Sequence, residues 1–291
     1  MLQTFSRQTV EQHLKMGQLE SSHKLWNITL LLATVVSYIP QYRAIQKPAA
    51  ASNVSLIYIL FNTLSALEQF TILAEHAMFP SELLTGVMNN PPTTGDWLNI
   101  AQVTAVLVMS LALFIKCVRC LPSTEPKAAS LAILIQFVLI TLVPLATQAC
   151  FQWANPKAHE GMTATIVCMF LTMHGFIVNP LVSAGVVWSY FWARAAQRQR
   201  PPRPGLSSRT LWLQALVFAL VAFSWAGRLT VNSSGMKPVT AWVYWYQTAG
   251  WATMNNLLFA FVQGGLFYHA LKERRALGAQ PPEDKIGLLT A

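Results

Sequence analysis

Long apolar stretches alternate along the chain with short segments that carry the charged residues, prolines and glycines. Each stretch has about 20 residues or more, which as an α-helix is long enough to cross the ~30 Å hydrocarbon core of a bilayer. The pattern predicts seven helices, over Leu25–Tyr42, Val54–Ala74, Trp97–Val118, Ala128–Phe151, Met162–Ala193, Leu211–Thr230 and Ala241–Leu271. The expected fold is an all-α polytopic membrane protein whose membrane domain covers residues 25–271.

The fifth and seventh apolar runs are longer than one upright crossing needs, at about 30 residues each. Such helices must tilt, kink or project beyond the bilayer. The dipeptide Asn179-Pro180 lies inside the fifth run. Proline removes a backbone donor and clashes with the preceding turn, so we expect a kink there.

Composition agrees with a membrane environment: 54% of the residues are hydrophobic and only 11% are charged. A soluble domain carries about a quarter charged residues. This excludes a soluble Rossmann enzyme, a disulfide scaffold and a nucleic-acid-binding module, although the net charge is +9. The basic residues lie in loops beside apolar spans, so the expected partner is membrane lipid and not nucleic acid.

Lysine and arginine predict the orientation, because cytoplasmic flanks carry an excess of them. Counted together with the helix ends beside them, the segments that follow helices one, three, five and seven hold 14 of the 20 basic residues, and the other segments hold 6. We therefore expect residues 1–24 to be lumenal and the tail 272–291 to be cytoplasmic, in a membrane of the endoplasmic reticulum. Residues 1–24 contain no apolar core, so they do not predict a cleavable signal peptide.

Glu68 is the outlier among the polar residues, because it lies about 21 Å into the second predicted helix. An intramembrane acid is expensive and marks a functional site by default. Burial favours its neutral, protonated form, unless a cation such as Arg228 reaches it. Glu68 is thus a candidate general acid. The alternative is a structural carboxyl that hydrogen-bonds between helices.

Two further residues are candidates for catalysis. Glu75 lies seven residues beyond Glu68, about 10 Å along the same stripe, where it would activate water or simply mark the helix end. His174 lies about 18 Å into the fifth helix, as a catalytic or a core histidine. Of Glu68 and its neighbour Gln69, only one is expected to face the pocket. Candidate substrate-binding residues in the lumenal half or deeper are Asn62, Gln102, Trp225, Arg228, Tyr244, Trp251 and Asn255.

Nucleotide, haem and metal fingerprints are absent from the sequence, including the P-loop, HExxH and GxSxG patterns. Cys117 and Cys120 form one CxxC pair, which lacks the four ligands of a structural zinc site. We therefore expect a reaction that needs neither cofactor nor metal.

Pro40-Gln41 lies at the end of the first predicted helix. With seven predicted helices, it resembles the PQ-loop membrane family, built from two three-helix repeats joined by a fourth helix in a 3+1+3 plan. Where a second PQ would stand, this chain has Phe191-Trp192. One hinge for alternating access is thus missing, which argues against a carrier. A PQ-loop carrier of small solutes stays the competing hypothesis, and a receptor or scaffold is the third.

A closer resemblance covers Ser37–Tyr42, Ser55–Asn62 and Ser65–Phe70. These stretches resemble small fungal membrane proteins of secondary-metabolite clusters, among them the ascofuranone and ascochlorin terpene cyclases and the aurovertin-type epoxide hydrolase. The resemblance implies opening of an epoxide on a lipophilic polyene or prenylated substrate. That substrate would come from an epoxidising monooxygenase of the same pathway. Hydrolysis and ring closure both remain open.

Overall fold

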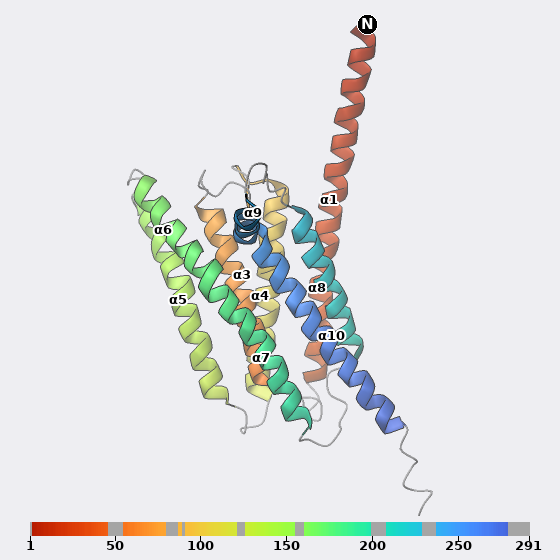
Figure 1. Cartoon of the computed structure of the whole chain (residues 1–291), viewed down its shortest axis with the longest axis vertical. Helices are drawn as coiled ribbons and strands as arrows, with labels where there is room; N and C mark the ends of the chain where they lie inside the picture. The colour runs from red at the N-terminus through yellow and green to blue at the C-terminus, as the bar shows by residue number, and fades with distance from the viewer. Residues whose placement is uncertain are drawn as a thin grey trace, which may run out of the picture.

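The computed structural model of the chain describes residues 2–45, 55–79, 87–88, 91–120, 126–154, 160–198, 208–228 and 237–278. Every regular element within these ranges is a helix (Figure 1). In chain order the helices are α1 Leu2–Ile45, α3 Leu56–Met78, α4 Thr94–Cys120, α5 Lys127–Ala154, α6 Glu160–Met173, α7 Asn179–Arg198, α8 Ser208–Arg228, α9 Pro238–Trp245 and α10 Trp251–Gly278. Two π-helical segments, η2 His174–Val178 and η3 Tyr246–Gly250, join α6 to α7 and α9 to α10.

Five helices of the described part are long and apolar enough to cross a membrane. They are Lys24–Ile45, Leu56–Met78, Thr94–Cys120, Lys127–Ala154 and Thr165–Arg194. The sixth predicted span is helical too, but its apolar part, Thr210–Ala226, is shorter. The seventh is helical without being among the five, since α10 contains several amides and a charged end. The chain is therefore an all-helical membrane protein, and the seven-span plan is supported as far as these five helices.

The first helix differs from its predicted bounds. We expected it to begin at Leu25, whereas α1 runs without interruption from Leu2 to Ile45. Figure 1 shows its N-terminal half projecting well beyond the other helices. The predicted apolar span agrees with the candidate span Lys24–Ile45, whereas the helix itself begins earlier than predicted, because the prediction followed the apolar run and a polar helix gives no such signal. Pro40 lies inside α1, whose helical structure continues past it.

Helix α3 is the centre of the bundle. Of its apolar window, 78% is buried, against 33% or less in the other four candidate spans. It begins at the N-cap Ser55, whose hydroxyl accepts a hydrogen bond from the Tyr58 N–H. It packs against α4, α5 and α7. Side chains on every face of α3 are therefore held inside protein, which makes it the helix best placed to carry a buried site.

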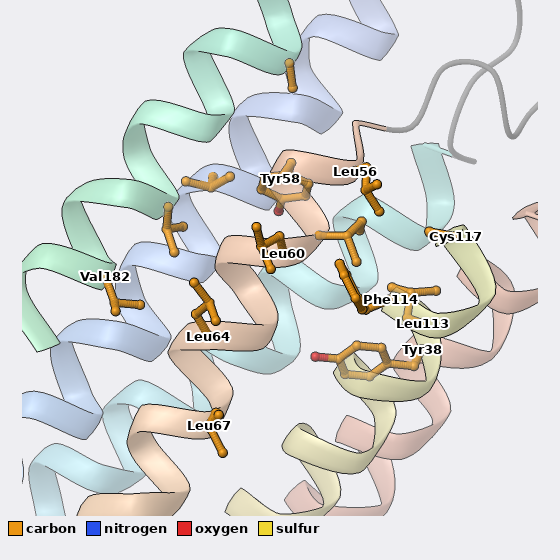
Figure 2. Close-up of a cluster of buried hydrophobic side chains, with 14 of the residues drawn as sticks. Tyr38, Leu56, Tyr58, Leu60, Leu64, Leu67, Leu113, Phe114, Cys117 and Val182 are labelled. Atoms are coloured by element: carbon orange, nitrogen blue, oxygen red, sulfur yellow. The ribbon is translucent and has the colours of Figure 1, made fainter. Parts of the chain in front are cut away.

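The largest apolar cluster lies around the N-terminal half of α3. Figure 2 shows part of it, with Leu60 and Leu64 of α3 near Leu113 and Phe114 of α4, and Tyr38 of α1 beside them. In hydrocarbon, van der Waals packing holds helices together, because lipid tails are as apolar as leucine. Close interdigitation of these side chains is therefore what fixes the rotation of α3 against its neighbours.

Gly185 of α7 lies directly against the ring of Phe61 on α3. A Cβ at this position would lie 2.1 Å from Cε1 of Phe61, whose ring packs edge-on against Trp188. We expect Gly185→Ala to lower the free energy of unfolding by about 1–3 kcal/mol, the usual range for overpacking. Thermal unfolding in detergent measures the effect. The matched control is Gly175→Ala, where nothing lies within 4 Å of the added Cβ, and equal losses in both variants would contradict the packing argument.

Candidate active site

The π-helical segment η2 interrupts the long helix formed by α6 and α7. At its end the Asn179 N–H donates to the carbonyl of His174, five residues earlier. Pro180 follows directly, with no N–H to donate and a ring that would crowd the carbonyl four residues back. A widened turn relieves this crowding, so the predicted deviation at Asn179-Pro180 takes the form of a π segment. Such segments occur frequently at functional sites.

A second π-helical segment, η3, lies between α9 and α10. The Trp251 N–H donates to the carbonyl of Tyr246. Gly250 ends the segment, and a Cβ there would lie 2.7 Å from the ring of Trp245, so only glycine leaves room for this indole. Both apolar runs of about 30 residues thus contain a π segment.

His174, the first residue of η2, contacts Glu68 of α3. Nδ1 of His174 lies 2.9 Å from Oε1 and 3.0 Å from Oε2 of Glu68, and both side chains are fully buried. The ring of Phe170, one turn earlier, stacks on the imidazole at a centroid distance of 4.1 Å. Two predicted catalytic residues, 106 positions apart in sequence, therefore form one contact at the centre of the bundle.

The two partners share one proton across this contact. Either the imidazole Nδ1–H donates to the carboxylate, or the carboxyl donates to Nδ1. On the other side of the ring, Nε2 of His174 is buried and has no hydrogen-bond partner among the described residues. An unsatisfied buried polar atom costs about 1–3 kcal/mol. Both oxygens of Glu68 thus contact Nδ1, whereas Nε2 of His174 is free to bind another group.

A chain of hydrogen bonds holds the two π segments beside this pair. Nδ2 of Asn179 donates to the Tyr246 hydroxyl at 3.0 Å, and Nδ2 of Asn255 donates to Oδ1 of Asn179 at 2.6 Å. The Ser183 hydroxyl donates to Oδ1 of Asn255 at 2.8 Å. Tyr246 lies within electrostatic range of Glu68. Asn255 was among the predicted binding residues, whereas Asn179, Ser183 and Tyr246 were not.

Asn179 directly precedes Pro180, and this dipeptide predicts a kink without indicating that the asparagine side chain takes part in a site. Ser183 and Tyr246 carry no local signal either, since small polar residues are common in helix interfaces of membrane proteins.

Glu75 lies apart from the pair. It is fully buried, and neither of its carboxyl oxygens makes a hydrogen bond with a described residue. Gln148 of α5 lies near it. No hydrogen bond in the described part of the chain joins Glu75 to Glu68 or His174, so its predicted role as a water-activating partner stays a prediction.

Several predicted binding residues lie on another face of α3. Gln102 and Trp225 line a small cavity together with Gln69, and Asn62 lines a second one. Trp251 packs against Trp225 with ring centroids 5.9 Å apart. Because adjacent helix positions point about 100° apart, Glu68 and Gln69 face different sites, and α3 divides what we expected to be one pocket.

Two further predicted binding residues lie at the ends of their helices. Tyr244 is half-buried on α9, next to η3. Arg228 is the last residue of α8, and its side chain falls outside the part of the chain that the structure describes.

Comparison with family models, with curated proteins and with solved structures gave no match to this chain.

The arrangement is suited to moving a proton inside hydrocarbon. A buried imidazole bonded to a carboxyl exchanges a proton at its free nitrogen, while the carboxyl holds the ring and stabilises the imidazolium. Among the described residues no group of three or more His, Cys, Asp or Glu is placed to hold a metal ion.

Proposed function

We propose that the chain is a membrane-embedded enzyme that opens an epoxide on a lipophilic substrate, with the Glu68–His174 pair as the proton donor. The observation that carries the proposal is the buried contact of these side chains, with Nε2 of His174 left without a partner among the described residues. An intramembrane acid with a defined partner is expected to be functional.

Opening of the epoxide needs one proton donor and one nucleophile, and the Glu68–His174 pair would supply the proton. The protonated pair gives the Nε2 proton of His174 to the epoxide oxygen as one C–O bond breaks, so that the leaving oxygen becomes a hydroxyl instead of an alkoxide. A nucleophile bonds to the carbon from the opposite face, and its proton returns to the pair. With water the net product is a diol, and with a hydroxyl of the substrate it is a cyclic ether. General acid catalysis of this kind contributes about 10²–10⁴-fold to a rate.

The location of the site favours a substrate that dissolves in the membrane. Tyr246, near Glu68, stacks on Trp242 at a centroid distance of 5.7 Å, and Trp242 is exposed at the surface of the bundle. Aromatic faces suit an alkene chain and a carbon on which positive charge develops. The resemblance to fungal terpene cyclases and epoxide hydrolases adds a polyene or prenylated skeleton, made by an upstream monooxygenase. The proposed setting is an internal membrane, with the chain as a seven-helix bundle whose N-terminus is lumenal.

One observation favours a second candidate, a proton-coupled carrier of the PQ-loop type. Gln41 of the Pro40-Gln41 motif is buried and donates to Oε1 of Gln214 on α8 at 2.6 Å. The motif thus contacts a second helix, as a hinge between moving bundles would. In a carrier the Glu68–His174 pair would relay protons.

Turnover by the purified protein in lipid nanodiscs distinguishes the two candidates. We expect consumption of a terpenoid epoxide such as oxidosqualene or an epoxyfarnesyl phenol, with formation of a diol or cyclic ether, and none with heat-denatured protein. The carrier predicts instead that no epoxide is consumed and that proteoliposomes take up a small solute when a pH gradient is applied. That pair of results would overturn the enzyme proposal.

A further inference from the structure

Two cavities lie on the side of α3 that faces away from His174. The first is lined by the polar side chains of Tyr38, Gln41, Asn62, Ser110 and Gln263. Each cavity has a volume of ≈ 10 Å³, counted as the space open to the centre of a water-sized sphere. This volume is enough for about one water molecule.

The second cavity lies further along the same helices. It is lined by Gln69, Gln102 and Asn256, and Nδ2 of Asn256 donates to Oε1 of Gln69 at 3.1 Å. Gln69 follows Asn62 by seven residues on α3, which is almost two full turns, so both point from one face. Asn256 and Gln263 have the same spacing on α10. The cavities are therefore two levels, about 10 Å apart, of one seam between α3, α4 and α10.

Two polar atoms at the first cavity have no hydrogen-bond partner among the described residues. Oδ1 of Asn62 and Oε1 of Gln263 are both buried and make no hydrogen bond with a described residue. Each such atom costs about 1–3 kcal/mol when left unsatisfied. Both are acceptors, so the missing group must donate at least two hydrogen bonds. Tyr38 and Ser110, whose hydroxyl oxygens lie 3.0 Å apart, complete the lining with further donors and acceptors.

The walls of both cavities carry no charged side chain among the described residues, which favours a neutral ligand over an ion. Neither cavity has a described Asp, Glu, Lys, Arg or His in its wall. A bare ion brought into such a site would lose its hydration with no opposite charge to compensate. A water molecule fits the volume, donates two hydrogen bonds, and gives up about 0–2 kcal/mol of entropy when it is ordered.

We propose that this seam is a binding site for water inside the membrane bundle, with one molecule bridging Asn62 and Gln263 and another beside Gln69 and Asn256. The site does not depend on the function proposed above, because neither Glu68 nor His174 lines either cavity.

Hydroxyl-radical footprinting of the protein in nanodiscs tests the site without any turnover assay. X-ray radiolysis makes radicals from local water, so a buried side chain next to ordered water is oxidised. Leu113 lines the first cavity and is 4% exposed, whereas the adjacent Phe114 is 1% exposed and does not line it. Phenylalanine reacts faster than leucine. We therefore expect oxidation at Leu113 to exceed that at Phe114, and the reverse order would overturn the proposal.

Two variants and one change of salt complete the test. Gln263→Leu removes the amide that would hold the water and leaves an apolar wall, so the label at Leu113 should be lost. Ser189→Ala removes a buried hydroxyl that lines neither cavity, so it should keep the label. Thermal unfolding verifies that both variants fold. Replacing NaCl by choline chloride should change nothing, and a label at Leu113 that appears only in choline would show that a cation occupies the site and would overturn the proposal.

Discussion

Glu68→Gln should reduce epoxide turnover by about 10²–10⁴-fold, the contribution of a general acid. The amide keeps the size of the carboxyl and still hydrogen-bonds to Nδ1 of His174, which lies 2.9 Å from Oε1 in the native pair. It neither shares a proton with the imidazole nor stabilises an imidazolium, so Nε2 loses its ability to protonate the substrate. The measurement is kcat/KM for the epoxide in nanodiscs.

A matched control lies on the same helix. Thr71 is fully buried, and its hydroxyl donates to the carbonyl of Leu67 on its own helix. Thr71→Val conserves its shape and should retain wild-type turnover, which separates a loss of chemistry from a loss of folding. Turnover by Glu68→Gln at the wild-type rate would mean that the pair is not the proton donor.

Glu68→Leu should lower the free energy of unfolding by about 3–5 kcal/mol, which is the effect of breaking a buried pair by removing one partner. The variant leaves the His174 ring buried with neither nitrogen hydrogen-bonded, since Nε2 already lacks a partner in the described part of the chain. Unfolding in detergent, followed by tryptophan fluorescence, reports the loss.

The double variant Glu68→Leu, His174→Phe gives this prediction its control. Apolar side chains of similar volume replace both partners, so no polar atom is left buried and most of the stability should return. The introduced phenyl ring would also pack against Phe170, which stacks on the native imidazole. Losses that simply add in the double variant would show that the two residues are not coupled.

Much of the architecture was predictable because the signals behind it are local. The length of an apolar run decides whether a helix crosses hydrocarbon, and all five candidate spans overlap predicted helices. Glu68 stood out for the same reason, as a carboxyl deep within an apolar run. The N-terminal half of α1 escaped prediction because a polar helix has no comparable signal.

The sequence could not predict that α3 separates Glu68 from other residues expected in the same pocket. Gln102 and Trp225 were expected near Glu68 by depth alone, yet they line the seam on another face of α3. Depth follows from counting residues, at about 1.5 Å each. The direction of a side chain follows from helix rotation, which packing against other helices decides.

The amino-acid sequence by itself determined that this protein is helical, that it belongs in a membrane, and that one acid lies deep within it. Only the tertiary structure decided which imidazole meets that acid, because the contact joins residues 106 positions apart and depends on a π turn that shifts the register of α6 against α7. Run length and hydropathy are properties of neighbouring residues. Partner choice depends on rotations of about 100° per residue and on contacts between distant segments, which no local pattern specifies.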